Sequence, residues 1–376
     1  MDGGAGPGLF DPFESRGARA RNRIGVSPMC QYCAAADARP TEWHLAHLLQ
    51  RAVGGAGIVF AEATAVSAEG RITARDLGLY DDAQARGHAR LAAAISRAGA
   101  VPAIQLAHAG RKASQEPPWV GGVDTSEATG WTPLAPSEVA MEGMLDPRAM
   151  SEGDIGEVVR DVAAAARRAA EVGYRVVELH AAHGYLLHQF LSPLSNRRND
   201  GWGGDFEGRT RLARECAAAA RGALPDSVSL WVRVSHTDWL DGGWTTEETV
   251  ELARRLRDLG VDAVDVSSGG IAARAPIPVG PGYQVPGAEA VRRGAPGLAV
   301  AAVGMIAEPT QANAVLRSGR ADVVLLARAL LRDPYWPLRA AEALGATDRL
   351  EAPPQYERGW GRYPVRGEAA EAFAAL

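Results

Sequence analysis

Short apolar runs rich in β-branched residues alternate along this chain with longer amphipathic stretches, and this alternation constrains the fold more than any other feature. Eight runs are predicted to be strands, over residues 24–27, 57–64, 101–106, 176–180, 229–234, 263–266, 298–303 and 322–327. Helical periodicity follows most of them, over 43–52, 83–98, 154–171, 206–222, 246–259, 309–317 and 334–342. The repeated unit predicts an α/β protein with a (β/α)8 TIM barrel, and it disfavours an open sheet.

Two stretches interrupt the alternation. Residues 111–150 and 267–287 are rich in glycine and proline and show no clear period. The first predicts a long excursion after the third strand. Loops of this length in a compact barrel are typical of active-site walls or lids. Along the chain we expect a flexible tail over residues 1–8, the barrel over 9–350 and a C-terminal extension over 351–376.

The composition excludes several classes of protein. The chain has 376 residues, and 47% of them are hydrophobic, which suits one barrel with a large core. The formal net charge is −5 and the charges are mixed, so no nucleic-acid partner is expected. No apolar run approaches the roughly 20 residues of a membrane span, and the start lacks an export signal. We therefore expect a cytoplasmic protein with no membrane partner.

Polar and small residues collect at the carboxyl ends of the predicted strands, where barrel enzymes hold their active sites. The fourth strand ends in His180-Ala181-Ala182-His183-Gly184-Tyr185. Two imidazoles and a phenol in one place could polarise a carbonyl, hold a metal or transfer a proton. After the seventh and eighth strands, Gly304 and Ala327 would let backbone amides approach an anion, which is consistent with a phosphorylated ligand.

Other interpretations of these residues stay open at this point. A His-x-x-His pair can be a buried polar cluster, and a metal site would need a third ligand, for which Glu178 is a candidate. The three cysteines, Cys30, Cys33 and Cys216, form neither a disulfide framework nor a four-ligand metal set. Cys30 and Cys33 spell Cys-x-x-Cys, but the small βαβ context of a thioredoxin-like redox pair is missing.

Seven motifs occur in order over almost the whole chain. They are residues 21–24 (RNRI), 27–32 (SPMCQY), 105–112 (QLAHAGRK), 180–185 (HAAHGY), 190–196 (FLSPLSN), 203–209 (GGDFEGR) and 355–360 (QYERGW). As an ordered set they resemble the Old Yellow Enzyme family of FMN-dependent ene-reductases, in its bacterial branch with a cysteine beside the flavin. The set is far more specific than any single motif. Ala327 departs from the family pattern, because glycine is usual before Arg328.

The resemblance implies a tightly bound FMN and a transient NADPH or NADH. It implies that one group of residues contacts the isoalloxazine through its backbone or its polar edge, and that another holds the phosphate. The first group is Ser27, Pro28, Met29, Cys30, Ala63, Gln105 and Arg233, and the second is Gly304, Ala327 and Arg328.

The resemblance also implies the roles around the substrate, an electron-poor alkene such as an enone, enal or maleimide. His180 and His183 would donate hydrogen bonds to its carbonyl, Tyr32 would help to bind it, and Tyr185 would protonate the α-carbon after hydride reaches the β-carbon. Arg358 would reach a neighbouring subunit, so a homodimer or higher homo-oligomer is expected. No metal is implied. The expected function is an NAD(P)H-dependent flavin oxidoreductase that acts as an ene-reductase.

Overall fold

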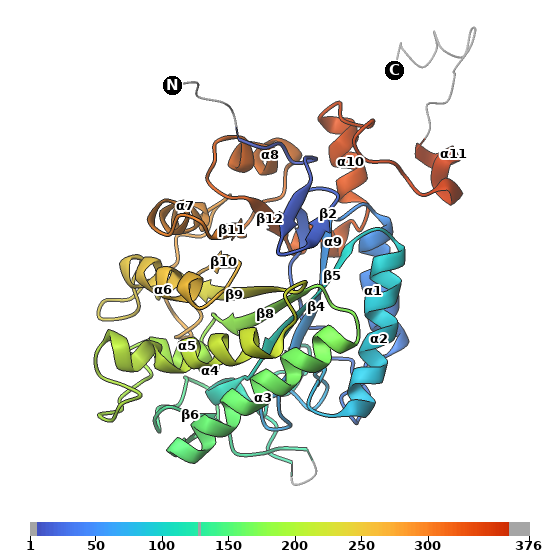
Figure 1. The fold of residues 1–376 in the computed structure, drawn as a ribbon. Helices are drawn as coiled ribbons and strands as arrows, with labels where there is room; N and C mark the ends of the chain where they lie inside the picture. The colour runs from blue at the N-terminus through green and yellow to red at the C-terminus, as the bar shows by residue number, and fades with distance from the viewer. Residues whose placement is uncertain (1–5, 127–128, 361–376) are drawn as a thin grey trace, which may run out of the picture.

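The computed structural model describes residues 6–126 and 129–360, and its centre is a closed barrel of parallel strands (Figure 1). Each strand pairs with the next one in the barrel along the chain, and the last pairs with the first. The strands are β3 (Ile24–Val26), β4 (Ile58–Ala65), β5 (Val101–Ala107), β8 (Val176–Ala181), β9 (Ser229–Ser235), β10 (Ala263–Ser267), β11 (Ala299–Ala302) and β12 (Val323–Leu326). All eight predicted strands are present, so the predicted (β/α)8 fold is confirmed.

Helices surround the barrel and bury their apolar faces against it (Figure 1). The seven predicted helices are confirmed as α1 (Glu42–Val53), α2 (Asp82–Arg97), α3 (Glu152–Glu171), α5 (Phe206–Ala223), α6 (Thr246–Asp258), α8 (Pro309–Arg317) and α10 (Trp336–Ala343). Capping boxes begin several of them. At α6, for example, the Thr245 hydroxyl accepts from the Glu248 amide while the Glu248 carboxylate accepts from the Thr245 amide.

The sequence did not predict three further helices, α4 (Leu186–Leu191), α7 (Val285–Gly294) and α9 (Arg328–Arg332). The predicted loop over 267–287 was too long, because α7 already begins at Val285. Pro286 favoured a loop there, but it lies in the first helical turn, where proline removes no intrahelical hydrogen bond. The other two helices have only five or six residues, too few to show a helical period.

A small antiparallel hairpin, which the sequence also did not predict, lies at the amino end of the barrel. It consists of β1 (Phe13–Ser15) and β2 (Ala18–Ala20). Its Phe13 ring packs against Trp231 of β9, with ring centroids 6.1 Å apart, and Phe60 of β4 packs on the same indole at 5.6 Å. These aromatic side chains fill the lower part of the barrel, so the structure is closed at this end.

The carboxyl end is covered differently. The predicted excursion after the third barrel strand is confirmed: after the short 3-10 helix η1 (Gly110–Lys112), the chain is mostly irregular as far as α3. It holds only the two-residue strands β6 (Leu134–Ala135) and β7 (Arg148–Ala149). At the C-terminus, η2 (Pro354–Tyr356) and α11 (Glu357–Trp360) lie beyond α10 (Figure 1), while residues 361–376 of the predicted extension lie outside the described residues. In the described ranges, no helix is long and apolar enough to cross a membrane.

Candidate active site

Four polar side chains meet inside the upper part of the barrel. Gln105 of β5 donates from Nε2 to Glu178 Oε1 of β8 at 2.8 Å, and Arg233 Nε of β9 lies 3.0 Å from Asp265 Oδ2 of β10. Burial, followed by the charge of Asp265, raises the pKa of the Glu178 carboxyl. Within the described residues, Glu178 Oε2 has no hydrogen-bond partner. Unpaired polar atoms at this depth are costly, which marks the cluster as a site with a task beyond packing.

The segment after β3 is joined to this cluster. Arg233 Nη1 donates to Ser27 Oγ at 3.1 Å, and the residues that follow, Pro28, Met29 and Cys30, are half-buried. A bulge in β4 falls between Ala61 and Ala63, so that Glu62 leaves the regular register and accepts the Gln31 amide at 3.1 Å. The bulge therefore holds the 27–32 segment beside Ala63, which brings together the residues predicted to contact the isoalloxazine.

His180 lies at the end of β8, beside Arg233 in the strand register. Its Nδ1 accepts the Ala182 amide at 3.3 Å, which places the ring proton on Nε2. Burial, followed by Arg233, lowers the pKa of His180 well below its usual value, so the imidazole is neutral near pH 7. Among the hydrogen bonds of the described residues, the one made by this ring is at Nδ1, and none involves Nε2. This ring is therefore a hydrogen-bond donor available to a ligand.

His183 lies at a strained turn. Its φ of 58° is in the left-handed region, which non-glycine residues rarely adopt. Three hydrogen bonds support this backbone: Lys112 Nζ donates to the His183 carbonyl at 2.7 Å, the His183 amide donates to Ser235 Oγ at 2.9 Å, and the Gly184 amide donates to His188 Nδ1 at 2.8 Å. The strain brings the two imidazoles together, with ring centroids 5.1 Å apart.

Tyr185 completes the predicted cluster, because its ring lies 4.8 Å from that of His180, centroid to centroid. Burial, followed by Cys30 and Tyr32, raises the pKa of its phenol, so the proton is held firmly. The ammonium of Lys112 lies 5.4 Å from the Tyr185 ring. Burial lowers the pKa of Lys112 to about 8. The structure thus confirms that His180, His183 and Tyr185 are neighbours.

Cys30 and Tyr32 lie on the other side of this cluster and pack with Tyr185 in one small apolar group. Burial, with Asp76 and Glu62, raises the pKa of the Cys30 thiol well above its usual value, so it is not a thiolate. The exposed Trp119 of the excursion packs edge-on against Tyr32, with centroids 6.0 Å apart. All three cysteines are free thiols. In the described ranges no three histidine, cysteine or acidic side chains are grouped as metal ligands.

The predicted phosphate residues lie at the carboxyl ends of the adjacent strands β11 and β12. Gly304 follows β11 with φ of 120°, a conformation that favours glycine, and its carbonyl accepts the Gly282 amide at 3.0 Å. Ala327 and Arg328 follow β12 at the start of α9. The same barrel mouth also holds the guanidinium of Arg233 and the amide side chain of Gln105. Together with the backbone at Gly304 and Ala327, these groups fit FMN.

Sequence reasoning assigned no role to one group at the same mouth. Ser267 Oγ at the end of β10 lies 2.7 Å from His183 Nε2 and donates to Gln284 Oε1 at 3.2 Å. The place of Ser267 at a strand end is evident from the sequence, but its contact with His183 is not. Gln284 precedes α7 in an irregular segment and gives no signal in the sequence.

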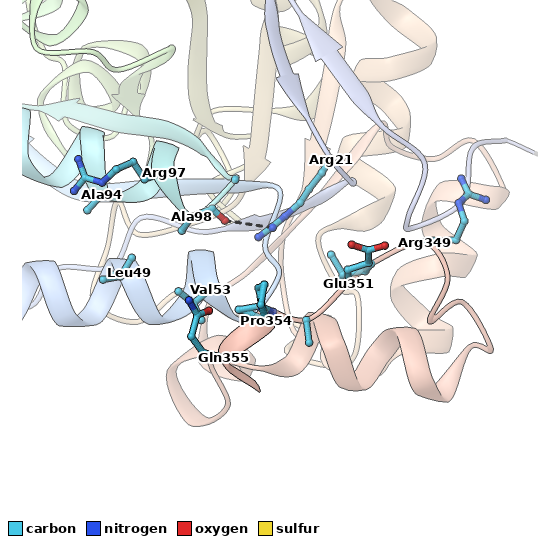
Figure 2. A pocket seen from close by; sticks show the side chains of 14 residues that line it. Arg21, Leu49, Val53, Ala94, Arg97, Ala98, Arg349, Glu351, Pro354 and Gln355 are labelled. Carbon is cyan, nitrogen blue, oxygen red and sulfur yellow. Dashed lines mark hydrogen bonds between the residues drawn. The ribbon is translucent and has the colours of Figure 1, made fainter. Parts of the chain in front are cut away.

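Arg358 is not brought to this site within one chain. It is exposed on α11, whose last residue, Trp360, packs near Tyr335. A cavity of about 750 Å³ lies elsewhere again, at the amino end of the barrel, between the ends of α1 and α2 and residues 349–355 (Figure 2). The described structure thus places the two histidines and Tyr185 at the carboxyl end, away from this cavity.

The fold and the site together define a flavin-dependent oxidoreductase built on a (β/α)8 barrel. Residues 8–346 match the model of the NADH:flavin oxidoreductase / NADH oxidase family. The chain belongs to this family, which includes Old Yellow Enzyme, and it is an NAD(P)H-dependent flavin oxidoreductase that uses FMN. The expected cofactors and enzyme class are confirmed.

Known relatives agree with this assignment over nearly the full length. The chain is 46% identical to the NADPH dehydrogenase of Geobacillus sp. (strain WCH70) over 94% of this chain and 98% of the relative. It is 42% identical to that of Bacillus subtilis (strain 168), over 94% and 99%. Among solved structures, morphinone reductase in complex with tetrahydroNAD is 27% identical with a TM-score of 0.74, covering 96% and 98% of the two chains. An Old Yellow Enzyme homologue from Zymomonas mobilis is 25% identical with a TM-score of 0.75, covering 96% and 100%.

Proposed function

We propose that this oxidoreductase is an ene-reductase that reduces the activated C=C bond of enones, enals, maleimides and similar electron-poor alkenes. The observation that carries the proposal is the arrangement at the end of β8. The neutral imidazole of His180 carries its proton on Nε2, and its ring centroid lies 4.8 Å from that of Tyr185. The raised pKa of Tyr185 keeps its phenol protonated. A hydrogen-bond donor beside a proton donor is what reduction of a carbonyl-conjugated alkene requires.

His180 supplies the polarisation. Its Nε2–H would donate to the carbonyl oxygen of the alkene, drawing electron density away from the β-carbon. Negative charge grows on that oxygen as hydride is added, so a donor fixed in advance stabilises the transition state more than the ground state. The Ala182 amide fixes the tautomer, and burial keeps the ring neutral. His183 and Tyr32 would form the rest of the carbonyl pocket.

FMN would be held by the residues gathered at the barrel mouth: Ser27, Pro28, Met29, Cys30, Ala63, Gln105, Arg233, Gly304, Ala327 and Arg328. When bound, FMN takes two electrons from NAD(P)H and supplies the hydride that reaches the β-carbon. Arg233 would provide positive charge at the polar edge of the flavin, and Asp265 holds that guanidinium in place. Gln105 would present its carbonyl oxygen, because its amide nitrogen already donates to Glu178.

Tyr185 would complete the reaction by giving its proton to the α-carbon. The phenolate left behind would be stabilised by the ammonium of Lys112, which lies 5.4 Å from the ring, until solvent returns the proton. The raised pKa of Tyr185 keeps the proton on the phenol until the α-carbon becomes basic enough to remove it.

We also propose that Arg358 acts in the site of a partner subunit, because α11 carries it away from the site of its own chain. An Arg358→Ala variant that stays an oligomer and loses affinity for the alkene would support this. A wild-type enzyme that is strictly monomeric and fully active would contradict it. Size-exclusion chromatography with light scattering measures the oligomeric state.

The ene-reductase proposal is tested by two half-reactions. The FMN-loaded protein is first reduced anaerobically with NADPH and then mixed with 2-cyclohexenone, while flavin absorbance is followed and the product identified. We expect rapid reoxidation and formation of cyclohexanone. In Tyr185→Phe, reoxidation should slow by about a hundredfold while reduction by NADPH stays near the wild-type rate.

A matched control is available just before the same strand. Tyr174 precedes β8 at its opposite end, where its hydroxyl bonds to His88 Nδ1 at 3.0 Å. Tyr174→Phe removes an equivalent hydroxyl far from the barrel mouth and should leave both half-reactions unchanged. If the alkene fails to speed reoxidation of the wild type beyond buffer alone, the protein is a flavin oxidoreductase of another kind.

A further inference from the structure

The polar cluster inside the barrel contains two acids and one base. Glu178 of β8, Arg233 of β9 and Asp265 of β10 lie on three adjacent strands, and all three side chains are buried. Arg233 is paired with Asp265, whose Oδ2 lies 3.0 Å from its Nε. On the other side of β10, the register places the uncharged Ala301 of β11 beside Asp265. Among the described residues, Glu178 is therefore an acid without a base of its own.

Glu178 holds its proton at neutral pH. Its Oε1 accepts from Gln105 Nε2 at 2.8 Å, whereas its Oε2 has no hydrogen-bond partner among the described residues. A charged carboxylate here would leave one oxygen neither solvated nor paired, which costs more free energy than a neutral acid. Burial and the negative charge of Asp265 accordingly raise the pKa of Glu178 well above its usual value. With Glu178 protonated, Arg233 and Asp265 balance each other and the cluster is neutral.

Asp265 lies close to the balance between its two forms. Burial raises its pKa to about 6, and the adjacent guanidinium of Arg233 limits that rise. The side chain is therefore ionised at pH 7, but only slightly more acidic conditions would protonate it. A further negative charge beside Arg233 would compete with Asp265 for the same guanidinium and repel its carboxylate. Such a charge would raise the pKa of Asp265 again.

We infer that Asp265 takes up a proton from solvent when the flavin is reduced, so that the charge of Arg233 is left to balance the flavin. The inference rests on the proposed contact of Arg233 with the polar edge of FMN. A hydride from NAD(P)H brings two electrons and one proton to the flavin, which adds one negative charge. Protonation of the Asp265 carboxylate cancels that charge, and the proton returns to solvent when the hydride leaves. Asp265 is thus a positioning residue that acts through Arg233.

The midpoint potential of the FMN-loaded protein measures how many protons accompany the two electrons. For a two-electron couple, each proton contributes about 30 mV per pH unit. The flavin accounts for one proton, and Asp265 adds a second above about pH 6, where it is ionised before reduction. Between pH 6.5 and 7.5 we therefore expect a slope close to about 60 mV per pH unit. A wild-type slope of about 30 mV per pH unit would overturn the inference.

Two variants of similar shape assign the second proton. Asp265→Asn cannot titrate, so its slope should fall to about 30 mV per pH unit. Glu178→Gln imitates the protonated acid and is the matched control, which should keep the wild-type slope. An unchanged slope in Asp265→Asn would place the second proton on the flavin or on another group. Loss of the slope in Glu178→Gln would make Glu178 the acceptor. Either result contradicts the inference.

Infrared difference spectroscopy gives a readout that needs no variant. In the reduced-minus-oxidised spectrum at pH 7, a newly protonated carboxyl group adds a C=O stretching band and removes carboxylate bands. We expect this C=O band to shift in protein labelled with ¹³C-aspartate and to stay in place with ¹³C-glutamate. A spectrum without the band would contradict the inference.

Dithionite replaces NADPH in both measurements, and no alkene is present, so the outcome does not depend on the ene-reductase proposal. Rapid reduction of cyclohexenone by a protein with the smaller slope would support that proposal and remove this inference. The larger slope in a protein that leaves cyclohexenone unchanged would do the reverse.

Discussion

The two ends of the barrel differ in the side chains that fill the interior. At the amino end, Phe13, Phe60 and Trp231 fill the interior with aromatic rings, and the β1–β2 hairpin closes it. At the carboxyl end, the interior holds Glu178 and Arg233, and a buried polar atom without a hydrogen-bond partner, such as Glu178 Oε2, costs free energy unless a ligand uses it. The comparison indicates that one end stabilises the fold and the other is built for chemistry.

The size of a cavity does not identify the end of the barrel that carries the chemistry. The cavity of about 750 Å³ in Figure 2 belongs to the amino end, where the guanidinium of Arg21 enters it. That guanidinium donates to the carbonyls of Ala52, Ala56 and Ala98, at the ends of α1 and α2. The Arg21 guanidinium is thus already hydrogen-bonded to backbone carbonyls. At the carboxyl end, the donor on His180 is still available.

The largest effect on stability is expected at the closed end. Trp231→Ala would leave a cavity between Phe13 and Phe60, and we expect the free energy of unfolding to fall by about 4 kcal/mol. Trp119→Ala, at an exposed indole, is the matched control and should change stability by less than about 0.5 kcal/mol. Urea unfolding of both variants makes the measurement. Equal losses would contradict the assignment of the core.

At the open end, a substitution should change activity rather than stability. His180→Leu removes the proposed donor to the carbonyl, and we expect kcat/KM for cyclohexenone to fall by about 10²–10³-fold. The unfolding midpoint should stay close to that of wild type, and FMN should remain bound. Loss of FMN in this variant would show that His180 supports the cofactor and not the substrate.

Acid stability tests an ionisable group outside both ends. His88 of α2 is fully buried, where its ring bonds to Tyr174 and to the Gly78 carbonyl, and burial lowers its pKa to about 4. In the unfolded chain His88 binds a proton as the pH falls below about 6.5, whereas in the folded chain it stays neutral down to about pH 4. Stability is therefore lost as pH falls through this window, by about 2 kcal/mol between pH 6.5 and 5. His88→Gln should reduce that loss, as measured by urea unfolding at the two pH values. Identical pH dependence in the two proteins would mean that His88 does not titrate as described.

The sequence predicted the parts of the molecule that depend on local patterns. The eight strands followed from apolar periodicity, and the His180–Tyr185 cluster followed from its place at a strand end. The hairpin was missed because its two strands have only three residues each and are held by a contact with Trp231 more than 200 residues away. Gln284 was missed because it lies in an irregular segment, and its hydrogen bonds to Ser267 and Val303 leave no local pattern in the sequence. What the sequence could not show is how distant segments meet.

Arg21 illustrates this limit and carries the smallest expected effect. It belongs to a motif shared with the family, yet its guanidinium binds backbone carbonyls at the closed end. Arg21→Lys keeps the positive charge, but a single ammonium group cannot bond to several carbonyls at once as the planar guanidinium does. We therefore expect the free energy of unfolding to fall by about 1 kcal/mol. Arg97→Lys, on the exposed rim of the same cavity, is the control and should change nothing measurable. Because Arg21 lies far from His180, kcat/KM should be unaffected in both variants. A drop in activity for Arg21→Lys at full stability would mean that the two ends of the barrel are coupled.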